Sequence, residues 1–279
     1  MKQKLVCLTK LVREEMDKVL RQEPADSQII EAAAYSTLDK FSCLYRSKLV
    51  FAGCEMVGLN QEEVLNSAAG IEFIHASSLI FDDLPCMDNS DYRRGRASTH
   101  KVYGGNTAIL AAIYLLNKGQ HLIIADALKF KKSQIVNPEL ELTLELGGLL
   151  GGQEKDLLSK SNSKDEFVQA YFQKNKLMYL ALTLPDLLKT ENYLDELRQI
   201  GYNLCVAYQL HDDLRDFKSR EVTGKNEKAR SKKLSNILSQ SSLEELKEQY
   251  LDSALTSSKK LPNSDFLNEL INLMFYQRP

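Results

Sequence analysis

The chain has 279 residues, with 36 basic and 38 acidic side chains, 43% hydrophobic residues and no Trp. These values are typical of a globular protein and exclude a disordered or fibrous chain. The formal charge of −2 gives no general attraction for a polyanion, so we expect no nucleic-acid partner. Any affinity for phosphate must therefore come from a local group of Lys and Arg.

The composition predicts an all-α fold. Only 13 Gly and 6 Pro interrupt a chain rich in Leu, Ala, Glu, Lys and Gln. After an amphipathic first helix at the N-terminus, apolar residues recur at helical spacing in seven runs, which are 27–57, 61–83, 105–126, 138–159, 165–188, 191–217 and 243–256. No linker divides these runs, so we expect a single domain over residues 1–279.

Three further features concern the surroundings of the protein. No stretch approaches about 20 uncharged apolar residues, so we expect no transmembrane segment. The five cysteines are widely spaced and form no CxxC pair, which favours a reducing, cytoplasmic location. The polar segment 219–233, rich in Lys and Arg, is expected to be a surface loop, either one that closes over a cavity or a plain one.

The first group of acidic residues follows the second run. Pro85 disfavours helix at Leu84, so the helix should end just after Asp82 and Asp83. A helix C-terminus already carries partial negative charge, and two carboxylates there destabilise it by up to ~1 kcal/mol each unless a cation joins them. Asp88 follows in the next turn and would complete an oxygen-only site of the kind that Mg²⁺ prefers. The alternative is a solvated acidic turn.

The second group contains Asp212, Asp213 and Asp216, which share an arc of about 100° on one helix. The apolar run that precedes them indicates a largely buried helix, where three like charges repel unless divalent ions bridge them. Two such groups facing each other across a helical bundle would hold Mg²⁺ and present it to a diphosphate.

Basic side chains stand close to both acidic groups in the sequence. They are Arg93, Arg94, Arg96, Lys174, Lys218 and Lys225. Each alone would be interpreted as a surface charge, and their position beside the aspartates favours a role in phosphate binding. Gln209 lies one turn before Asp213, and His75 lies two turns before Asp82, where it is either a core residue or a diphosphate contact.

These residues resemble the trans-isoprenyl diphosphate synthases over most of the chain. The segment DDLPCMDNSDYRRGRASTHKVYG is similar to the first aspartate-rich motif of that family, YQLHDDLRD to the second, and GGQEKD, with Gln153 and Asp156, to its GQxxD motif. The resemblance implies a helical bundle around a central cavity and a homodimer. It also implies condensation of an allylic diphosphate with isopentenyl diphosphate.

The resemblance assigns roles to particular residues. It implies Mg²⁺ held by Asp82, Asp83, Asp88 and Asp212, with Asp213 and Asp216 supporting a second site. Arg93 and Lys174 would bind the allylic diphosphate, and Gln209 would steady the allylic cation. Arg94 and His75 would bind isopentenyl diphosphate, and Arg46 and Lys225 complete the candidate substrate contacts.

The sequence departs from the family where isopentenyl diphosphate binds. Cys43 stands where the family carries a lysine, and only Arg46 survives from the Gly-Gly-Lys-Arg-x-Arg-Pro segment. One lost charge-assisted hydrogen bond weakens affinity by ~10- to 100-fold. Lys40, one helical turn before Cys43, is a candidate replacement. The family's Lys-Thr pair reads Lys174-Asn175, and Phe81 replaces a frequent histidine.

Product length and two alternative functions remain open at this point. In the family that the sequence resembles, the residues just before the first aspartates form the wall of a tunnel that holds the growing chain. Ser77 and Ser78 stand there and are small, which favours a C20 product over C15, although Phe73 would close the tunnel early. A terpene-synthase-like enzyme would ionise a prenyl diphosphate without using isopentenyl diphosphate. A non-catalytic synthase subunit would keep the fold and has little reason to keep all six aspartates.

Overall fold

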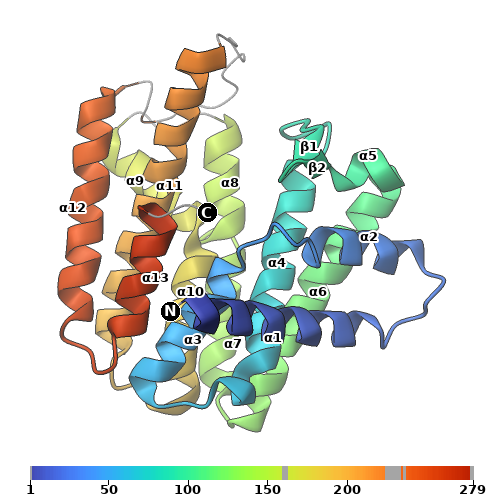
Figure 1. Cartoon of the computed structure of the whole chain (residues 1–279), viewed down its shortest axis with the longest axis horizontal. Helices are drawn as coiled ribbons and strands as arrows, with labels where there is room; N and C mark the ends of the chain where they lie inside the picture. Colours follow the sequence, from blue (N-terminus) through green and yellow to red (C-terminus); the bar gives the residue numbers. More distant parts are fainter. Residues whose placement is uncertain (1, 159–162, 224–233, 235–236, 277–279) are drawn as a thin grey trace. The chain divides into compact units, whose positions relative to one another are not determined.

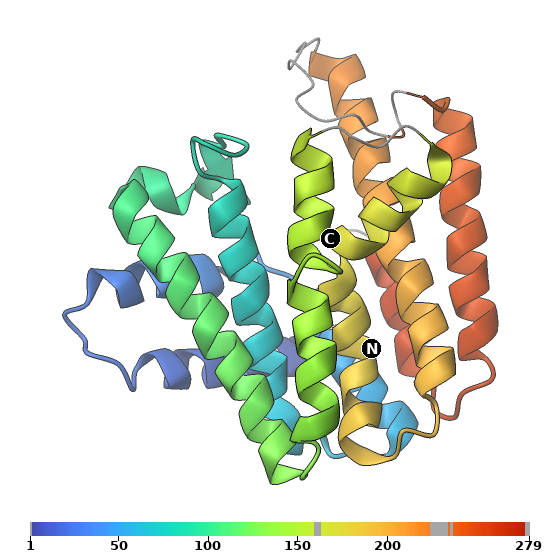
Figure 2. The same cartoon turned by 180° about the vertical axis from the view of Figure 1, so that it is seen from behind.

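The computed structural model describes residues 2–158, 163–223, 234 and 237–276, without the side chains of 216–223. Within these residues the regular secondary structure is helical except for one short hairpin, which confirms the all-α prediction (Figures 1 and 2). It forms two compact units. Unit 1 comprises Met1–Phe51 and Asn60–Ser133, and unit 2 comprises Ala52–Leu59 and Gln134–Pro279. The prediction of a single functional domain stays a prediction.

Unit 1 contains the first half of the helices and the hairpin. Its elements are α1 (Lys2–Leu20), α2 (Gln28–Thr37), the start of α3 (Tyr45–Val57), the 3₁₀ helix η1 (Gln61–Val64), α4 (Leu65–Asp82), β1 (Tyr92–Arg93), β2 (Arg96–Ala97), α5 (Thr99–Tyr103) and α6 (Gly105–Lys129). In both cartoon views α4 and α6 lie side by side, and the β1–β2 hairpin follows the end of α4 (Figures 1 and 2).

Two glycines allow α4 and α6 to pack closely. A methyl carbon added at Gly70 would lie 2.6 Å from the carbonyl oxygen of Gly119, and one at Gly119 would lie equally close to the carbonyl of Gly70. At the other end of this contact, buried Asp126 of α6 accepts hydrogen bonds from the amide and hydroxyl of Ser67, at 2.8 and 2.7 Å. The carboxylate thus satisfies donors in the first turn of α4 and fixes the helix that carries Asp82.

Unit 2 contains the remaining helices. They are the end of α3, α7 (Ser133–Leu144), α8 (Leu149–Leu158), α9 (Lys164–Lys174), α10 (Lys176–Lys189), α11 (Leu194–Thr223), α12 (Gln240–Ser258) and α13 (Asp265–Phe275). A core of large apolar side chains joins α9, α11 and α12, including Phe167, Val206, Leu210 and Leu243. Figures 1 and 2 show α11 and α12 running alongside each other.

Most predicted helices are confirmed, with differences at their ends. Three of the runs each contain two helices, because 27–57 is divided at 38–44, 138–159 at 145–148 and 165–188 at Asn175. The expected loop 219–233 is wrong for 219–223, which extend α11, and its remainder, 224–233, lies outside the described residues. The amphipathic helix α13 was not predicted.

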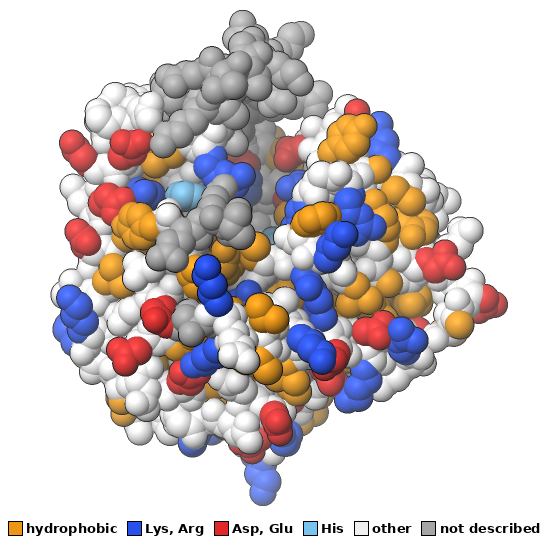
Figure 3. All heavy atoms as spheres, viewed as in Figure 1, with side chains coloured by type: hydrophobic (Ala, Val, Ile, Leu, Met, Phe, Trp, Pro, Cys, Tyr) orange, Lys and Arg blue, Asp and Glu red, His pale blue; other side chains and the backbone are white. Residues whose placement is uncertain are grey.

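Two helical segments of unit 1 have the length and apolar composition of a membrane span. They are Gln61–Asp82, of which 67% of the apolar window is buried, and Gly105–Lys129, of which 39% is buried. The first is therefore a core helix of unit 1, and the second combines a core face with exposed apolar residues. The expectation of no transmembrane segment stays a prediction. On the face shown in Figure 3, acidic and basic side chains are intermixed.

Candidate active site

The first aspartate pair lies where the sequence places it, at the C-terminus of α4. The helix ends at Asp82, with Asp83 as the capping residue. The chain then folds back on itself, because the amide of Asp88 donates to the carbonyl of Asp82 at 2.9 Å and the amide of Ser90 donates to Asp83 at 3.2 Å. The predicted helix end and the return of the chain are confirmed. Asp82, Asp83 and Asp88 therefore all lie in the helix end of α4 and the hydrogen-bonded turn that follows it.

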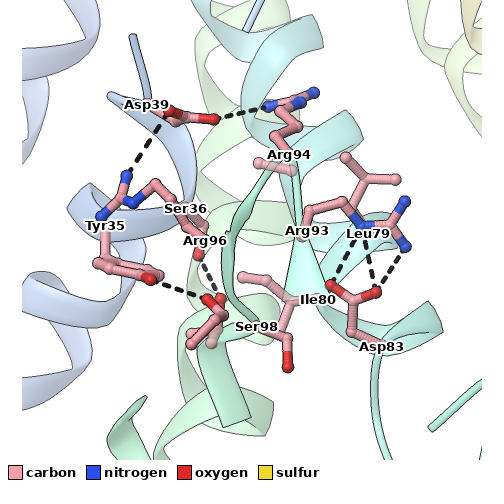
Figure 4. A pocket seen from close by; sticks show the side chains of 13 residues that line it. Tyr35, Ser36, Asp39, Leu79, Ile80, Asp83, Arg93, Arg94, Arg96 and Ser98 are labelled. Carbon is pink, nitrogen blue, oxygen red and sulfur yellow. Dashed lines mark hydrogen bonds and ion pairs between the residues drawn. The ribbon is translucent and has the colours of Figure 1, made fainter. Parts of the chain in front are cut away.

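Arg93 on β1 reaches back to this turn. Its Nε and Nη2 donate to the buried carboxylate of Asp83 at 3.1 and 2.5 Å. Figure 4 shows the guanidinium of Arg93 directed at the carboxylate of Asp83. Burial alone lowers the pKa of Arg93, but the hydrogen bond and charge of Asp83 outweigh it and raise the pKa above its ordinary value. The guanidinium is thus permanently charged and held beside Asp83, Asp82 and Asp88.

The hairpin turn separates the tasks of two consecutive arginines. Arg93 pairs with Arg96 across the hairpin, so Arg94 and Gly95 are the two turn residues, with φ of 53° and 77°. Positive φ at both positions matches a type I′ turn, which glycine adopts freely and arginine adopts with strain. The turn directs Arg94 away from Asp83, toward Asp39 on the other side of the hairpin (Figure 4). Strain of this kind gathers at functional sites.

Arg94, Arg46 and His75 form one electrostatic group within unit 1. Burial lowers the pKa of His75 well below its ordinary value, and the charges of Arg46, Arg94 and Arg93 lower it further. His75 is therefore neutral at physiological pH and able to donate one hydrogen bond without adding charge. Glu72, one turn before His75 on α4, accepts the amide of Ser47 at 2.8 Å and so holds the first turn of α3, which carries Arg46. The structure thus brings together the residues predicted for isopentenyl diphosphate.

Arg13 holds the segment 38–44, between α2 and α3, in place. Arg13 Nη2 donates to the carbonyls of Asp39, Lys40 and Ser42 at 2.9 to 3.0 Å. The helical spacing expected between Lys40 and Cys43 is wrong, because the segment is not helical. Lys40 is exposed, with its Nζ over the ring of Phe41.

A different lysine approaches Cys43. Lys48, in the first turn of α3, is buried and donates from Nζ to the carbonyl of Cys43 at 2.6 Å. Burial lowers the pKa of Lys48, while the charges of Cys43 and Glu72 oppose that effect. Lys48, on the helix that follows, therefore brings a positive charge close to Cys43, the position where a lysine was expected.

In unit 2, Lys174 is held by the aspartate of the GGQEKD segment. Its Nζ contacts Asp156 Oδ2 at 2.5 Å, and Lys155 donates to Gln173 at 2.8 Å, so two polar contacts join α8 and α9. Gly152 makes this approach possible, because a methyl carbon there would lie 2.4 Å from the backbone nitrogen of Lys174. The GGQEKD segment and Lys174 are therefore in direct contact within unit 2.

A second polar network surrounds Asp213, which is fully buried on α11. The hydroxyl of Tyr171 donates to one carboxylate oxygen, and Gln209 donates to the other at 3.4 Å. Asn175 in turn donates to Gln209 at 3.1 Å, which fixes the orientation of the Gln209 amide. Burial and the neighbouring negative charge of Asp213 raise the pKa of Tyr171, so the phenol stays protonated as the donor.

The other residues of the second acidic group differ in their surroundings. Asp212 is half-buried and lies 3.6 Å from Arg215. The side chains of Asp216 and Lys218 and the whole of Lys225 lie outside the described residues, so their predicted roles stay predictions. The common arc expected for the aspartates thus contains one enclosed carboxylate, Asp213, and one accessible carboxylate, Asp212.

The donor chemistry fits Mg²⁺. Asp82, Asp88 and Asp212 offer partly exposed carboxylates, and Mg²⁺ in phosphate-using sites is commonly held by one or two carboxylates together with substrate phosphates. Among the described residues, no three or more His, Cys, Asp or Glu side chains converge as a complete ligand set. Asp82 and Asp88 in unit 1, and Asp212 in unit 2, thus each have the oxygen chemistry that Mg²⁺ prefers.

The residues predicted to control product length lie in the packed part of α4. Ser77 is buried, and its hydroxyl donates to the carbonyl of Ala112 on α6 at 2.7 Å. Ser78 is half-buried and donates to the carbonyl of His75 at 2.8 Å, whereas Phe73 is fully buried. Ser77 therefore also serves the contact between α4 and α6.

Sequence reasoning missed two residues that hold the site. Tyr171 lies three residues before Lys174, so helical spacing places both on one side of α9 and was a usable signal. Asp39 lies in a turn, and its contacts with Arg94 and Arg96 join segments more than 50 residues apart. Contacts between segments so far apart in the sequence cannot be predicted from a local sequence pattern.

Comparison with solved structures defines the class of fold. The chain is similar to an FPP/GFPP synthase from Zymomonas mobilis, with 22% identity, a TM-score of 0.83 and coverage of 97% of this chain and 98% of that one. It is also similar to a geranyltranstransferase from Thermotoga maritima, with 26% identity, a TM-score of 0.81 and coverage of 98% and 99%. These neighbours show the isoprenyl synthase fold.

The family follows from the sequence comparisons. The polyprenyl synthetase family model matches residues 27–274, so the chain belongs to the polyprenyl synthetase family. The chain is 36% identical over 207 residues to a chloroplastic geranylgeranyl pyrophosphate synthase from Capsicum annuum, covering 71% of this chain and 56% of that protein. It is 35% identical over 210 residues to geranylgeranyl pyrophosphate synthase 9 from Arabidopsis thaliana, covering 71% and 58%. The chain spans just over half the length of these curated relatives.

Proposed function

We propose that this protein is a trans-prenyltransferase that condenses an allylic diphosphate with isopentenyl diphosphate to give a longer prenyl diphosphate. The observation that carries this proposal is the arrangement at the end of α4. There Asp83 and Arg93 form a hydrogen-bonded ion pair, and Arg46 and Arg94, with the neutral His75, form a neighbouring cationic group. An acidic and a basic site on the same unit match a reaction that handles two diphosphates.

Each charged group has a task in this reaction. Arg93 and Lys174 bind the allylic diphosphate and stabilise the negative charge that grows on the leaving pyrophosphate as the allylic C–O bond breaks. The double bond of isopentenyl diphosphate, held by Arg46, His75 and Arg94, then attacks the allylic carbon. Loss of a proton to the released pyrophosphate completes the new double bond. Gln209, whose amide Asn175 orients, steadies the allylic cation.

Mg²⁺ is the proposed cofactor, with Asp82, Asp83, Asp88, Asp212, Asp213 and Asp216 as the candidate residues of its sites. When bound, it neutralises phosphate charge and so favours departure of pyrophosphate. Asp82, Asp88 and Asp212 are the direct ligands in this proposal. Asp83 and Asp213 act through Arg93 and Tyr171, because their oxygens accept hydrogen bonds from those side chains.

A C20 product is the proposed product length. Ser77 and Ser78 are small, and the relatives from Capsicum annuum and Arabidopsis thaliana are named geranylgeranyl pyrophosphate synthases. A protein that closes its tunnel at Phe73 would release C15 instead.

We also propose that the protein forms a homodimer and that it works in a reducing compartment. In support, α5 and α6 expose apolar side chains, among them Val102, Ile109, Leu110 and Ile113. The described cysteines are all free thiols. Light scattering after size exclusion tests the dimer. Leu110→Glu is expected to give a monomer, and a dimer unaffected by this change would place the interface elsewhere.

Incubation of the purified protein with Mg²⁺, labelled isopentenyl diphosphate and geranyl or farnesyl diphosphate tests the function. The expected product is a longer prenyl diphosphate that carries the label. A hydrocarbon or alcohol made without isopentenyl diphosphate would identify the terpene-synthase-like alternative, which the loss of the lysine at Cys43 favours. Absence of any product would identify a non-catalytic subunit.

A further inference from the structure

The cationic group of unit 1 contains a carboxylate that its proposed task does not require. Asp39, in the turn after α2, is 7% exposed and lies between two guanidinium groups (Figure 4). Its Oδ2 is 3.9 Å from Nη1 of Arg94, and its Oδ1 is 3.6 Å from Nη1 of Arg96. A site that binds a diphosphate through arginines thus holds a negative charge of its own.

The two contacts are ion pairs and not hydrogen bonds. Both distances exceed the 2.7–3.2 Å range of N–H···O hydrogen bonds, so the guanidinium N–H groups keep their donors for another acceptor. At such separations the Coulomb interaction is still strong near a protein surface. Asp39 therefore opposes the binding of an anion without blocking the donors that an anion would use.

The surrounding chain holds the carboxylate in this position. Oδ1 accepts the amide of Phe41 at 3.0 Å, and Arg13 clamps the carbonyls of Asp39, Lys40 and Ser42. On the other side, the guanidinium of Arg96 lies 3.9 Å from the ring centroid of Tyr35, which limits its movement. The carboxylate and Arg96 are thus both fixed by groups outside the ion pair.

The free space beside the cluster is small. The cavity lined by Tyr35, Asp39, Arg94 and Arg96 has a volume of about 30 Å³, enough for a few water molecules beside the carboxylate (Figure 4). A phosphate that contacts Arg94 or Arg96 here comes close to the charge of Asp39, because the same cavity is lined by all three side chains.

We propose that Asp39 is an internal counter-ion of the isopentenyl diphosphate site, and that it sets the affinity of this site by competing with the substrate phosphates for Arg94 and Arg96. The inference rests on the proposed function for the identity of the substrate. In the free protein the carboxylate balances two neighbouring guanidinium groups that would otherwise repel each other. When a diphosphate binds, the same charge repels it and weakens its binding.

Asp39→Asn tests the proposal, because the amide oxygen still accepts the amide of Phe41 while the negative charge is lost. The expected result is a ~3- to 10-fold lower KM for isopentenyl diphosphate, where tenfold corresponds to about 1.4 kcal/mol. The KM for the allylic diphosphate is expected to stay unchanged, because Arg93 pairs with Asp83 instead.

Asp91→Asn is the matched control. It removes the same charge from the adjoining segment, where Asp91 is exposed and pairs with Lys101 at 2.7 Å, away from Arg94. This variant is expected to leave both KM values unchanged. Equal effects of the two variants, or an unchanged or higher KM for isopentenyl diphosphate in Asp39→Asn, would overturn the proposal.

Binding of inorganic pyrophosphate separates this inference from the proposed function. Calorimetry in the presence of EDTA measures the basic sites without metal and without turnover. Asp39→Asn is expected to bind pyrophosphate several-fold more tightly than the wild type even if no prenyl product is ever formed. Unchanged binding would refute the counter-ion role. Asp39→Ser, whose hydroxyl can accept the Phe41 amide, gives the same test if the Asn variant does not fold.

Discussion

The packing of α8 against α9 at Gly152 leads to a quantitative prediction. A methyl carbon at this position would lie 2.4 Å from the nitrogen and 2.7 Å from the Cα of Lys174, whereas ordinary contacts begin at 3.4 Å. Backbone atoms cannot rotate away, so Gly152→Ala must separate the two helices by about 1 Å. Overpacking of this kind costs ~1–3 kcal/mol, and the better helix propensity of Ala returns ~1 kcal/mol. A net loss of up to about 2 kcal/mol is therefore expected.

Urea denaturation measures this loss as a lower midpoint at an unchanged slope. Gly105→Ala is the matched control, since Gly105 is also helical and nothing lies within 4 Å of the added methyl carbon. The control is expected to leave stability unchanged or raise it by up to ~1 kcal/mol. Because Lys174 moves with α9, Gly152→Ala is also expected to raise the KM for the allylic diphosphate. Equal stability of the two variants would refute the reasoning.

Three other perturbations test separate parts of the structure. Asp126→Ala leaves the amide and hydroxyl of buried Ser67 without an acceptor, so the unfolding free energy should fall by ~2–3 kcal/mol; a loss below 0.5 kcal/mol would contradict the capping role. Tyr171→Phe removes a hydrogen-bond donor from buried Asp213 and should lower the free energy of unfolding by ~1–3 kcal/mol in thermal or urea denaturation. Tyr92→Phe, at a side chain exposed to solvent, should leave it unchanged, and equal effects of the two variants would argue against the network around Asp213. The pKa of His75 is lowered in the folded protein, so below pH ~6.5 the unfolded chain takes up a proton that the folded chain does not. The free energy of unfolding therefore decreases as the pH is lowered below ~6.5. His75→Gln should reduce this slope by up to ~1.4 kcal/mol per pH unit, and identical slopes in the variant and the wild type would disprove the reasoning.

The sequence was sufficient for features that local chemistry determines. Pro85 placed the end of α4 at the aspartate pair, and the helical period placed most helices within a few residues. The type of residue at Asp82, Asp88 and Asp212 indicated oxygen donors for Mg²⁺. These inferences rest on neighbours within about one turn of helix, where backbone sterics and charge act directly.

Features that depend on distant segments were not predictable in this way. Asp39 faces Arg94 only because Arg13 holds the turn after α2 and the hairpin turn directs Arg94 toward it. Asp213 was expected to share an arc of metal-binding carboxylates with Asp212, but packing of α9 against α11 encloses it beside Tyr171. Tertiary contacts thus decided which carboxylates remain accessible.

The central claim is that the accessible aspartates and the cationic group together elongate an allylic diphosphate. The most direct measurement is the transfer of label from isopentenyl diphosphate to product by the wild type and by Asp82→Ala, with Mg²⁺ present. The account predicts a labelled, longer prenyl diphosphate from the wild type and none from the variant. A folded wild type that incorporates no label, or a variant as active as the wild type, would contradict it.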